Sequence, residues 1–153
     1  YRRLEMAISR GAGTEIIRCA SFEEVGVTAR KLIIGVQHHI YTVLTIIIQG
    51  RTRSGTEKGY LNLHGYDTIG GDTNVQMPLI ITDIAVGETF VWNDKISFNG
   101  YEPVDFTPPM DDATKQDAIA DQGSSVSQYL SLGTDSDNTY YDVQISYIDQ
   151  NNA

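Results

Sequence analysis

The fold class is decided by one stretch, Ile40-Tyr41-Thr42-Val43-Leu44-Thr45-Ile46-Ile47-Ile48-Gln49. Most of its side chains are β-branched or aromatic, and such side chains fit a pleated, packed surface. The apolar part of the stretch is far shorter than the roughly 20 residues that a membrane-spanning helix needs. Apolar and polar residues do not alternate along it. We therefore expect a strand that is buried on both faces and central in its sheet.

Further strands are expected on both sides of this stretch. The run from Val75 to Val86 is rich in β-formers, but Pro78 lacks the N–H that a ladder needs. This run is therefore expected at a sheet edge, or with a break at the proline. The last strand alternates, with Val143, Ile145 and Tyr147 on one face. The other expected strands are short runs of apolar and aromatic residues at 31–36, 60–66, 89–98 and 126–132.

Seven to nine short strands predict an all-β chain, folded as an antiparallel β-sandwich or jelly roll. Residues 1–30 show weak periodicity, and we interpret them as an N-terminal arm before a β-sandwich domain of residues 31–150. Residues 101–125 hold three of the four prolines and are interpreted as an insertion between strands. Within this insertion, Met110–Ala120 is compatible with a short helix. Residues 151–153 form a polar tail.

The charge of the chain is unevenly distributed. Its 153 residues carry a net charge of −9. Residues 1–60 hold nine basic and five acidic groups, a sum of +4, whereas residues 61–153 hold two basic and fifteen acidic groups, a sum of −13. A pI of 4.6 argues against a nucleic-acid binder. A basic arm and an acidic body suit head-to-tail contact between subunits, although acidic groups also keep a surface soluble. We expect neither a nucleic acid nor a membrane as partner.

Candidate metal ligands do not form a complete set. Adjacent residues such as His38-His39 point to opposite faces of a strand, and His64 stands alone. The stretch Asp135-Ser136-Asp137-Asn138 resembles the opening of a calcium loop. The sixth and twelfth positions of that loop hold Tyr140 and Ser146, where a glycine and a glutamate are required. We therefore expect no metal and no cofactor.

Signals for catalysis are equally weak. The single cysteine, Cys19, excludes an internal disulfide and is interpreted as a small core residue rather than a reactive thiol. Several carboxylates of the insertion lie at helical spacing, where a solvated acidic face explains them as well as a glycosidase pair does: Asp111, Asp112, Asp117 and Asp121. No catalytic residue is assigned, and the chain is not expected to be an enzyme.

Three segments carry a family resemblance. They are Ile84 to Thr89 (Ile-Ala-Val-Gly-Glu-Thr), Lys95 to Phe98 (Lys-Ile-Ser-Phe) and Ser146 to Asp149 (Ser-Tyr-Ile-Asp). With the strand at Ile40, they resemble small β-sandwich virion proteins of tailed bacteriophages over residues 30–100 and 126–150. The resemblance implies a structural protein that decorates the capsid or belongs to the neck or tail. It implies no catalytic residue, and residues 101–125 depart from the compact pattern.

The resemblance also implies a partner class and a location. We expect an oligomer that contacts other virion proteins, located in the virion and made in the host cytoplasm. The candidate interface residues lie in the arm and the insertion: Arg2, Arg3, Arg10, Arg18, Pro108, Pro109 and Met110. Two alternatives remain open at this point. One is a carbohydrate- or receptor-binding module of a tail fibre, and the other is a hydrolase on a β-sandwich scaffold.

Overall fold

A computed structural model describes residues 13–52, 57–66, 72, 74–103, 125–136 and 138–152 of the chain. All regular elements in these ranges are β-strands, and no helix occurs among them. The strands are β1 (Thr14–Val25), β2 (Arg30–Ile34), β3 (His39–Thr52), β4 (Gly59–Gly65), β5 (Val75–Thr82), β6 (Thr89–Trp92), β7 (Ile96–Asn99), β8 (Tyr101–Pro103), β9 (Ser125–Ser127), β10 (Tyr129–Thr134) and β11 (Tyr140–Asn151).

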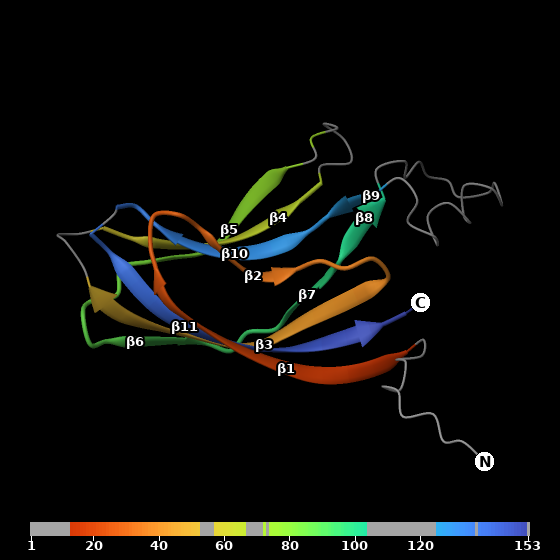
Figure 1. Ribbon diagram of the computed structural model, residues 1–153, viewed down its shortest axis with the longest axis horizontal. Coiled ribbons are helices and arrows are strands. Elements are labelled where there is room, and N and C mark those ends of the chain that lie inside the picture. The colour runs from red at the N-terminus through yellow and green to blue at the C-terminus, as the bar shows by residue number, and fades with distance from the viewer. Residues whose placement is uncertain are drawn as a thin grey trace, which may run out of the picture.

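The strands form two antiparallel sheets that face each other (Figure 1). The first sheet has the order β1-β11-β3-β6, and β7 pairs with the other end of β3. The second sheet has the order β2-β10-β4-β5. The short strands β8 and β9 pair with each other. The predicted all-β antiparallel sandwich is therefore confirmed.

Strand β3 occupies the centre of the first sheet, as the sequence predicts, but it is not buried on both faces. Tyr41 and Val43 face the core, and beyond Thr45 the core-facing residues are Ile46 and Ile48. Ile47 lies on the outer face and is only partly covered. The register with β11 shifts between Val43 and Thr45, so β3 holds one extra residue there. Such a bulge reverses the phase of the side chains. The missing alternation therefore reflects a bulge and not burial on two sides.

Strand β5 lies at the edge of the second sheet, and the prediction from Pro78 is confirmed. It pairs with β4 alone among the described strands. Its register shifts from Ile80 directly to Pro78, which leaves Leu79 as an extra residue. The proline thus sits beside a bulge on an edge strand, where its missing N–H is tolerated.

The N-terminal segment is partly incorporated into the sandwich. Strand β1, which falls inside the expected arm, pairs with β11 from Thr14–Asn151 to Val25–Tyr141. Val25 is only 1% exposed and belongs to the core. Residues 14–25 therefore form an edge strand of the first sheet, so the expectation that they belong to an N-terminal arm is wrong. Residues 1–12 lie outside the described residues. Of the insertion, only its ends are described, as β8 and β9, and the expected helix at Met110–Ala120 lies outside the described residues.

The core fills the space between the two sheets. It draws on inward-facing residues of both layers, and the alternation expected for β11 is observed, with Val143 and Ile145 buried and Tyr147 packed against them. The fully buried large side chains are Tyr141, Ile46, Ile48, Leu61, Leu130, Leu132 and Ile145.

Three backbone segments meet at one end of the sandwich. Gly35 N donates to Gln128 O at 2.8 Å, Gln128 N donates to Gly100 O at 2.8 Å, and Gly100 N donates to His39 O at 2.7 Å. A Cβ at Gly35 would lie 2.1 Å from the carbonyl oxygen of Gly100. Only glycine, which has no Cβ, lets the backbone at residue 35 come this close to the Gly100 carbonyl. The three hydrogen bonds hold β8 and β9 against the ends of both sheets.

The assignment of faces along β3 yields a first prediction. Ile46→Ala is expected to lower the free energy of unfolding by about 2–5 kcal/mol, because it opens a cavity at a fully buried position. The neighbouring Ile47→Ala should cost about 1 kcal/mol or less, since that side chain lies on the outer face. Urea denaturation of both variants measures the difference. Equal losses would show that the bulge does not set the faces as described.

Candidate functional site

The edges of the two sheets differ in how they are protected. An edge strand offers unpaired backbone groups to other chains, and charged side chains discourage such pairing. The long edge β1 carries charges along its length: Glu15, Arg18, Glu23 and Glu24. The edge β5, with the sequence Val-Gln-Met-Pro-Leu-Ile-Ile-Thr, carries none. Its bulge and Pro78 are the only protections of this kind that it shows.

Strand β5 also exposes large apolar side chains. Met77 is 60% exposed, Ile81 56% and Val75 38%. Met77 is paired with Leu63, which lies on the same face of β4 as the fully buried Leu61. Paired residues of antiparallel strands point to the same side, so Met77 faces the interior side of its sheet. Its exposure shows that the described part of the first sheet does not cover this corner.

A shallow hollow of about 170 Å³ marks this uncovered corner. It is lined by Leu63, Gly65, Tyr66, Val75, Met77 and Gln128. Most of its lining is apolar or aromatic, and it opens beside the edge of β5 that no described strand pairs with. The corner therefore combines an apolar hollow with an edge that no described strand pairs with. Ile81 lies along the same edge but is paired with Tyr60, so its side chain is on the outer face, opposite Met77. We call the three exposed residues Val75, Met77 and Ile81 the β5 edge patch.

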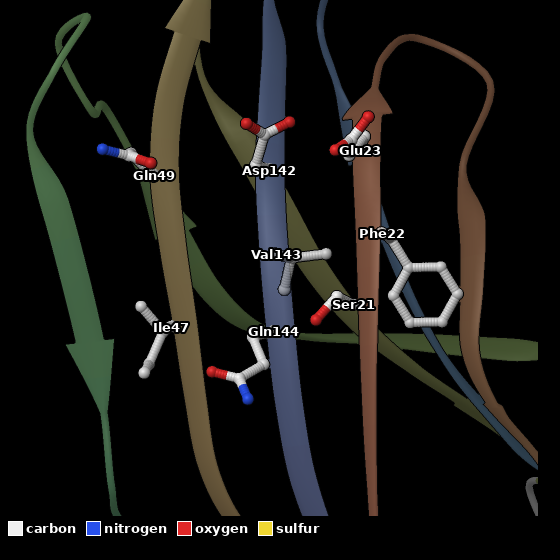
Figure 2. Close-up of a pocket in the computed structure, with 8 residues that line it drawn as sticks. All are labelled: Ser21, Phe22, Glu23, Ile47, Gln49, Asp142, Val143 and Gln144. Carbon is white, nitrogen blue, oxygen red and sulfur yellow. The ribbon is translucent and has the colours of Figure 1, made fainter.

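A second hollow, of about 220 Å³, lies on the outer face of the first sheet (Figure 2). Ser21, Gln144, Gln49 and Asp142 offer hydroxyl, amide and carboxylate groups around Ile47, whereas the ring of Phe22 points away from them (Figure 2). Sugar binding usually relies on an aromatic face for stacking. Because this hollow presents no such face, it does not favour the carbohydrate-binding alternative.

Asp142, one of the two carboxylates that line this hollow, is already paired within the chain. Arg51 Nη1 lies 3.4 Å from Asp142 Oδ1, and Arg51 Nη2 lies 3.4 Å from Glu24 Oε1. The backbone N–H of Glu24 also donates to Asp142 Oδ1 at 3.1 Å. These contacts link β1, β11 and β3 across the sheet. They are largely exposed to solvent, so each contributes little to stability.

On the outer face of the second sheet, one aromatic ring is held from both sides. Tyr129 stacks on His64 with 4.0 Å between ring centroids, and Lys31 Nζ lies 4.3 Å from the centroid of the tyrosine ring. The contact with the lysine is a cation–π interaction. A ring engaged in this way offers no free face to a sugar.

His64 also joins two polar residues in an arrangement that the sequence does not reveal. Its Nε2 lies 2.9 Å from Ser131 Oγ, and its Nδ1 lies 3.4 Å from Asn74 Oδ1. Ser131 is 67 residues away along the chain, so no spacing motif signals the pair. Burial lowers the pKa of His64, an effect that the hydrogen bond with Asn74 opposes and the charge of Lys31 reinforces. A neutral imidazole is therefore favoured.

The Ser131–His64 pair resembles part of a catalytic triad but lacks access. Ser131 is 1% exposed and His64 is 6% exposed. A nucleophile must reach the substrate, and a buried hydroxyl cannot. The hollow beside the β5 edge patch lies on the opposite face of β4, lined by Leu63 and Gly65. The pair is best understood as a satisfied polar contact between β4 and β10.

The buried carboxylate of Asp149 on β11 links this strand to both of its neighbours in the first sheet, β1 and β3. Asp149 Oδ2 accepts a hydrogen bond from Arg18 Nε at 2.8 Å, and Asp149 Oδ1 accepts one from His39 Nδ1 at 2.6 Å. The side chain of Asp149 is 5% exposed and that of Arg18 is 48% exposed. Burial raises the pKa values of the nearby Tyr41 and Tyr147 hydroxyls. Arg18, a candidate interface residue, thus bonds within its own chain and fastens β1 to β11.

The remaining candidates from the sequence are placed as follows. His39 points to Asp149, whereas His38 lies in the turn before β3 with a φ of +66°. Asp135 Oδ2 accepts from the backbone N–H of Lys58 at 3.1 Å. Cys19 is exposed and lies 3.3 Å from Ser146 Oγ, so its interpretation as a core residue is wrong. The residues that lie outside the described ranges are Arg2, Arg3, Arg10, Pro108, Pro109, Met110, Asp111, Asp112, Asp117, Asp121 and Asp137.

Two features are absent from the part of the chain that the structure describes. Among the described residues, no three histidine, cysteine, aspartate or glutamate side chains converge in a way that would hold a metal ion. No helix within that part of the chain is long and apolar enough to span a membrane.

Comparison with known proteins yields distant likenesses. No family model and no curated protein matches the chain. A chain of Bacillus endospore appendages, which form disulfide-linked pili, aligns over 97% of both chains with 10% identity and a TM-score of 0.42. A chain of the infectious bursal disease virus particle aligns over 97% of this chain and 38% of its own length, with 7% identity and a TM-score of 0.40. A chain of the Gx strain of that virus covers 88% and 31%, with 7% identity and a TM-score of 0.37. Scores this low carry no argument about function.

The buried His64 yields a second prediction. Its pKa in the folded chain lies below the ordinary value of 6.5, so the unfolded chain binds a proton first as the pH falls. Stability should therefore decline as the pH falls through 6.5 and on toward the lower pKa of the folded state. In His64→Gln this part of the decline should disappear, which thermal melts between about pH 8 and pH 5 will measure. A decline of unchanged size in the variant would assign it to other groups.

Proposed function

We propose that the chain is a non-enzymatic structural subunit of a virus particle that binds neighbouring subunits through the free edge of β5. The observation that carries this proposal is the β5 edge patch. It combines an uncharged edge strand with three exposed apolar side chains, at 38–60% exposure. Proteins that stay monomeric usually place charged side chains on such edges, so an edge without charges and with exposed apolar side chains favours pairing with another chain.

The finer assignment is to a tailed bacteriophage, as a capsid decoration or cement protein or as a head–tail protein. Its support is the resemblance of Ile84–Thr89, Lys95–Phe98 and Ser146–Asp149 to virion proteins of that kind. Under this proposal the protein is made in the host cytoplasm and resides in the virion. Its partners are further copies of itself and other virion proteins.

The described surface gives less support to the alternatives. The outer hollow of Figure 2 lacks an aromatic face for a sugar, and both faces of Tyr129 are engaged. A hydrolase would need an accessible nucleophile or carboxylate pair, whereas Ser131 and Asp149 are buried and bonded within the chain. An assembly role gives the β5 edge patch a function, because a neighbouring subunit would cover it. Neither sugar binding nor hydrolysis assigns a role to this patch.

A third prediction tests the patch directly. We expect the full chain to self-associate in sedimentation velocity experiments. Met77→Asp/Ile81→Asp should weaken this association about tenfold to a hundredfold, because the variant loses the burial of two apolar side chains in the contact. The matched control is Ile17→Asp/Val91→Asp. It adds the same charge at exposed apolar positions of the first sheet, which are 69% and 54% exposed.

The control should associate like the unaltered chain, and all variants should melt within a few degrees of it, because the substituted side chains are exposed. Equal weakening in both double variants would trace the effect to added charge alone. No weakening in Met77→Asp/Ile81→Asp would remove β5 as the interface.

A further inference from the structure

We propose that the free edge of β5 receives the N-terminal segment of a second copy, with residues 4–8 added as an extra strand. This inference rests on the proposed function, because it names the occupant of the β5 edge patch. Added strands of this kind gain affinity from main-chain hydrogen bonds and specificity from alternate side chains. Three observations support the assignment: side-chain pattern, charge and reach.

The pattern of the N-terminal segment fits the patch. Its apolar residues Leu4, Met6 and Ile8 occupy every second position and alternate with Glu5 and Ala7. In a strand, alternate residues share one face. A strand formed by this segment would therefore present three apolar side chains together. Val75 and Met77 offer the matching surface on β5, beside the hollow of about 170 Å³ that no described residue fills.

The charges of donor and acceptor are opposite. Residues 1–12 contain three arginines and one glutamate, so their net charge is 3 − 1 = +2. Residues 72 and 74–103, which contain β5 to β8, hold five acidic residues and one lysine, so their net charge is 1 − 5 = −4. The acidic residues of this region are Asp72, Asp83, Glu88, Asp94 and Glu102. Long-range attraction between the two regions raises the rate of encounter.

The reach of the segment assigns it to a second copy. Gly13 N donates to Asn151 O, so the described chain begins at the β1 edge of the first sheet. Strands β1 and β2 follow each other after a short turn, which places them on one side of the sandwich, and β5 is the opposite edge of the second sheet. A strand added beyond β5 would lie four strand spacings and one sheet separation from β1, about 22 Å in a straight line through the core.

The five steps from Ile8 to Gly13 span at most about 18 Å. Residues 4–8 of the same chain therefore fall short of their own β5 edge, even before the detour around the core is counted. A second copy has no such limit. The contact joins the N-terminal side of one copy to the β5 side of the next, so it is head-to-tail and builds a chain or a closed ring of subunits.

The test is a complementation of two full-length variants. Met6→Asp/Ile8→Asp impairs the donor strand and keeps the acceptor edge, whereas Val75→Asp/Met77→Asp impairs the acceptor and keeps the donor. Each variant alone should associate about a hundredfold more weakly than the unaltered chain. An equimolar mixture should form a dimer of one copy of each and nothing larger, as measured by sedimentation velocity. The matched control, Ala7→Asp/Ser9→Asp, changes the charge equally on the other face of the donor and should associate normally.

The outcomes separate this inference from the proposed function. If the acceptor variant dissociates while Met6→Asp/Ile8→Asp associates normally, β5 remains the interface but its occupant is not the N-terminal segment. If both variants are monomeric alone and in the mixture, the segment and the edge do not bind each other, and the inference is overturned. Equal loss in the control and the donor variant would overturn it as well, because charge and not the apolar face would then govern association.

Discussion

The ladder between β3 and β11 is the interaction on which the rest of the structure depends. The ladder extends from the Tyr140–Thr52 pair to the Asn151–His39 pair and contains two register shifts. Strand β11 carries β1 on its other side, and β3 carries β6 and β7. Each side of this sheet is thus built outward from one central pair of strands. Because the sheets do not close on themselves, the same construction leaves free edges, and their chemistry becomes the main functional question.

The sequence predicts the parts of the fold in which one residue type dominates. The β-branched stretch at Ile40 identifies the central strand, and Pro78 identifies an edge with a bulge. Strand β1 shows only weak periodicity in the sequence, because Arg18 faces inward, where it pairs with Asp149, so the apolar alternation is broken. The bulge after Val43 reverses the phase of the side chains in β3. The apolar residues therefore do not alternate regularly with polar ones, and the sequence looks like that of a strand buried on both faces.

The candidate site is less predictable than the fold, for two physical reasons. The contact of His64 with Ser131 joins residues 67 positions apart, and only the pairing of β4 with β10 brings them together. The exposure of Met77 depends on where the opposite sheet ends, which no local pattern of residues records. Apolar residues at 75–81 predict a strand equally well whether its edge is covered or free. The surface proposed to bind a neighbour is therefore visible only in three dimensions.

The central claim is that β5 is free in the isolated chain and paired in the assembly. Hydrogen–deuterium exchange of the full chain, compared at low and high protein concentration, tests this most directly, because a newly paired edge protects its amides from exchange. The account predicts that association slows exchange within Val75–Thr82, apart from Pro78, while Thr14–Val25 of the edge β1 exchanges at an unchanged rate. Protection that appears in β1 and spares β5 would contradict it.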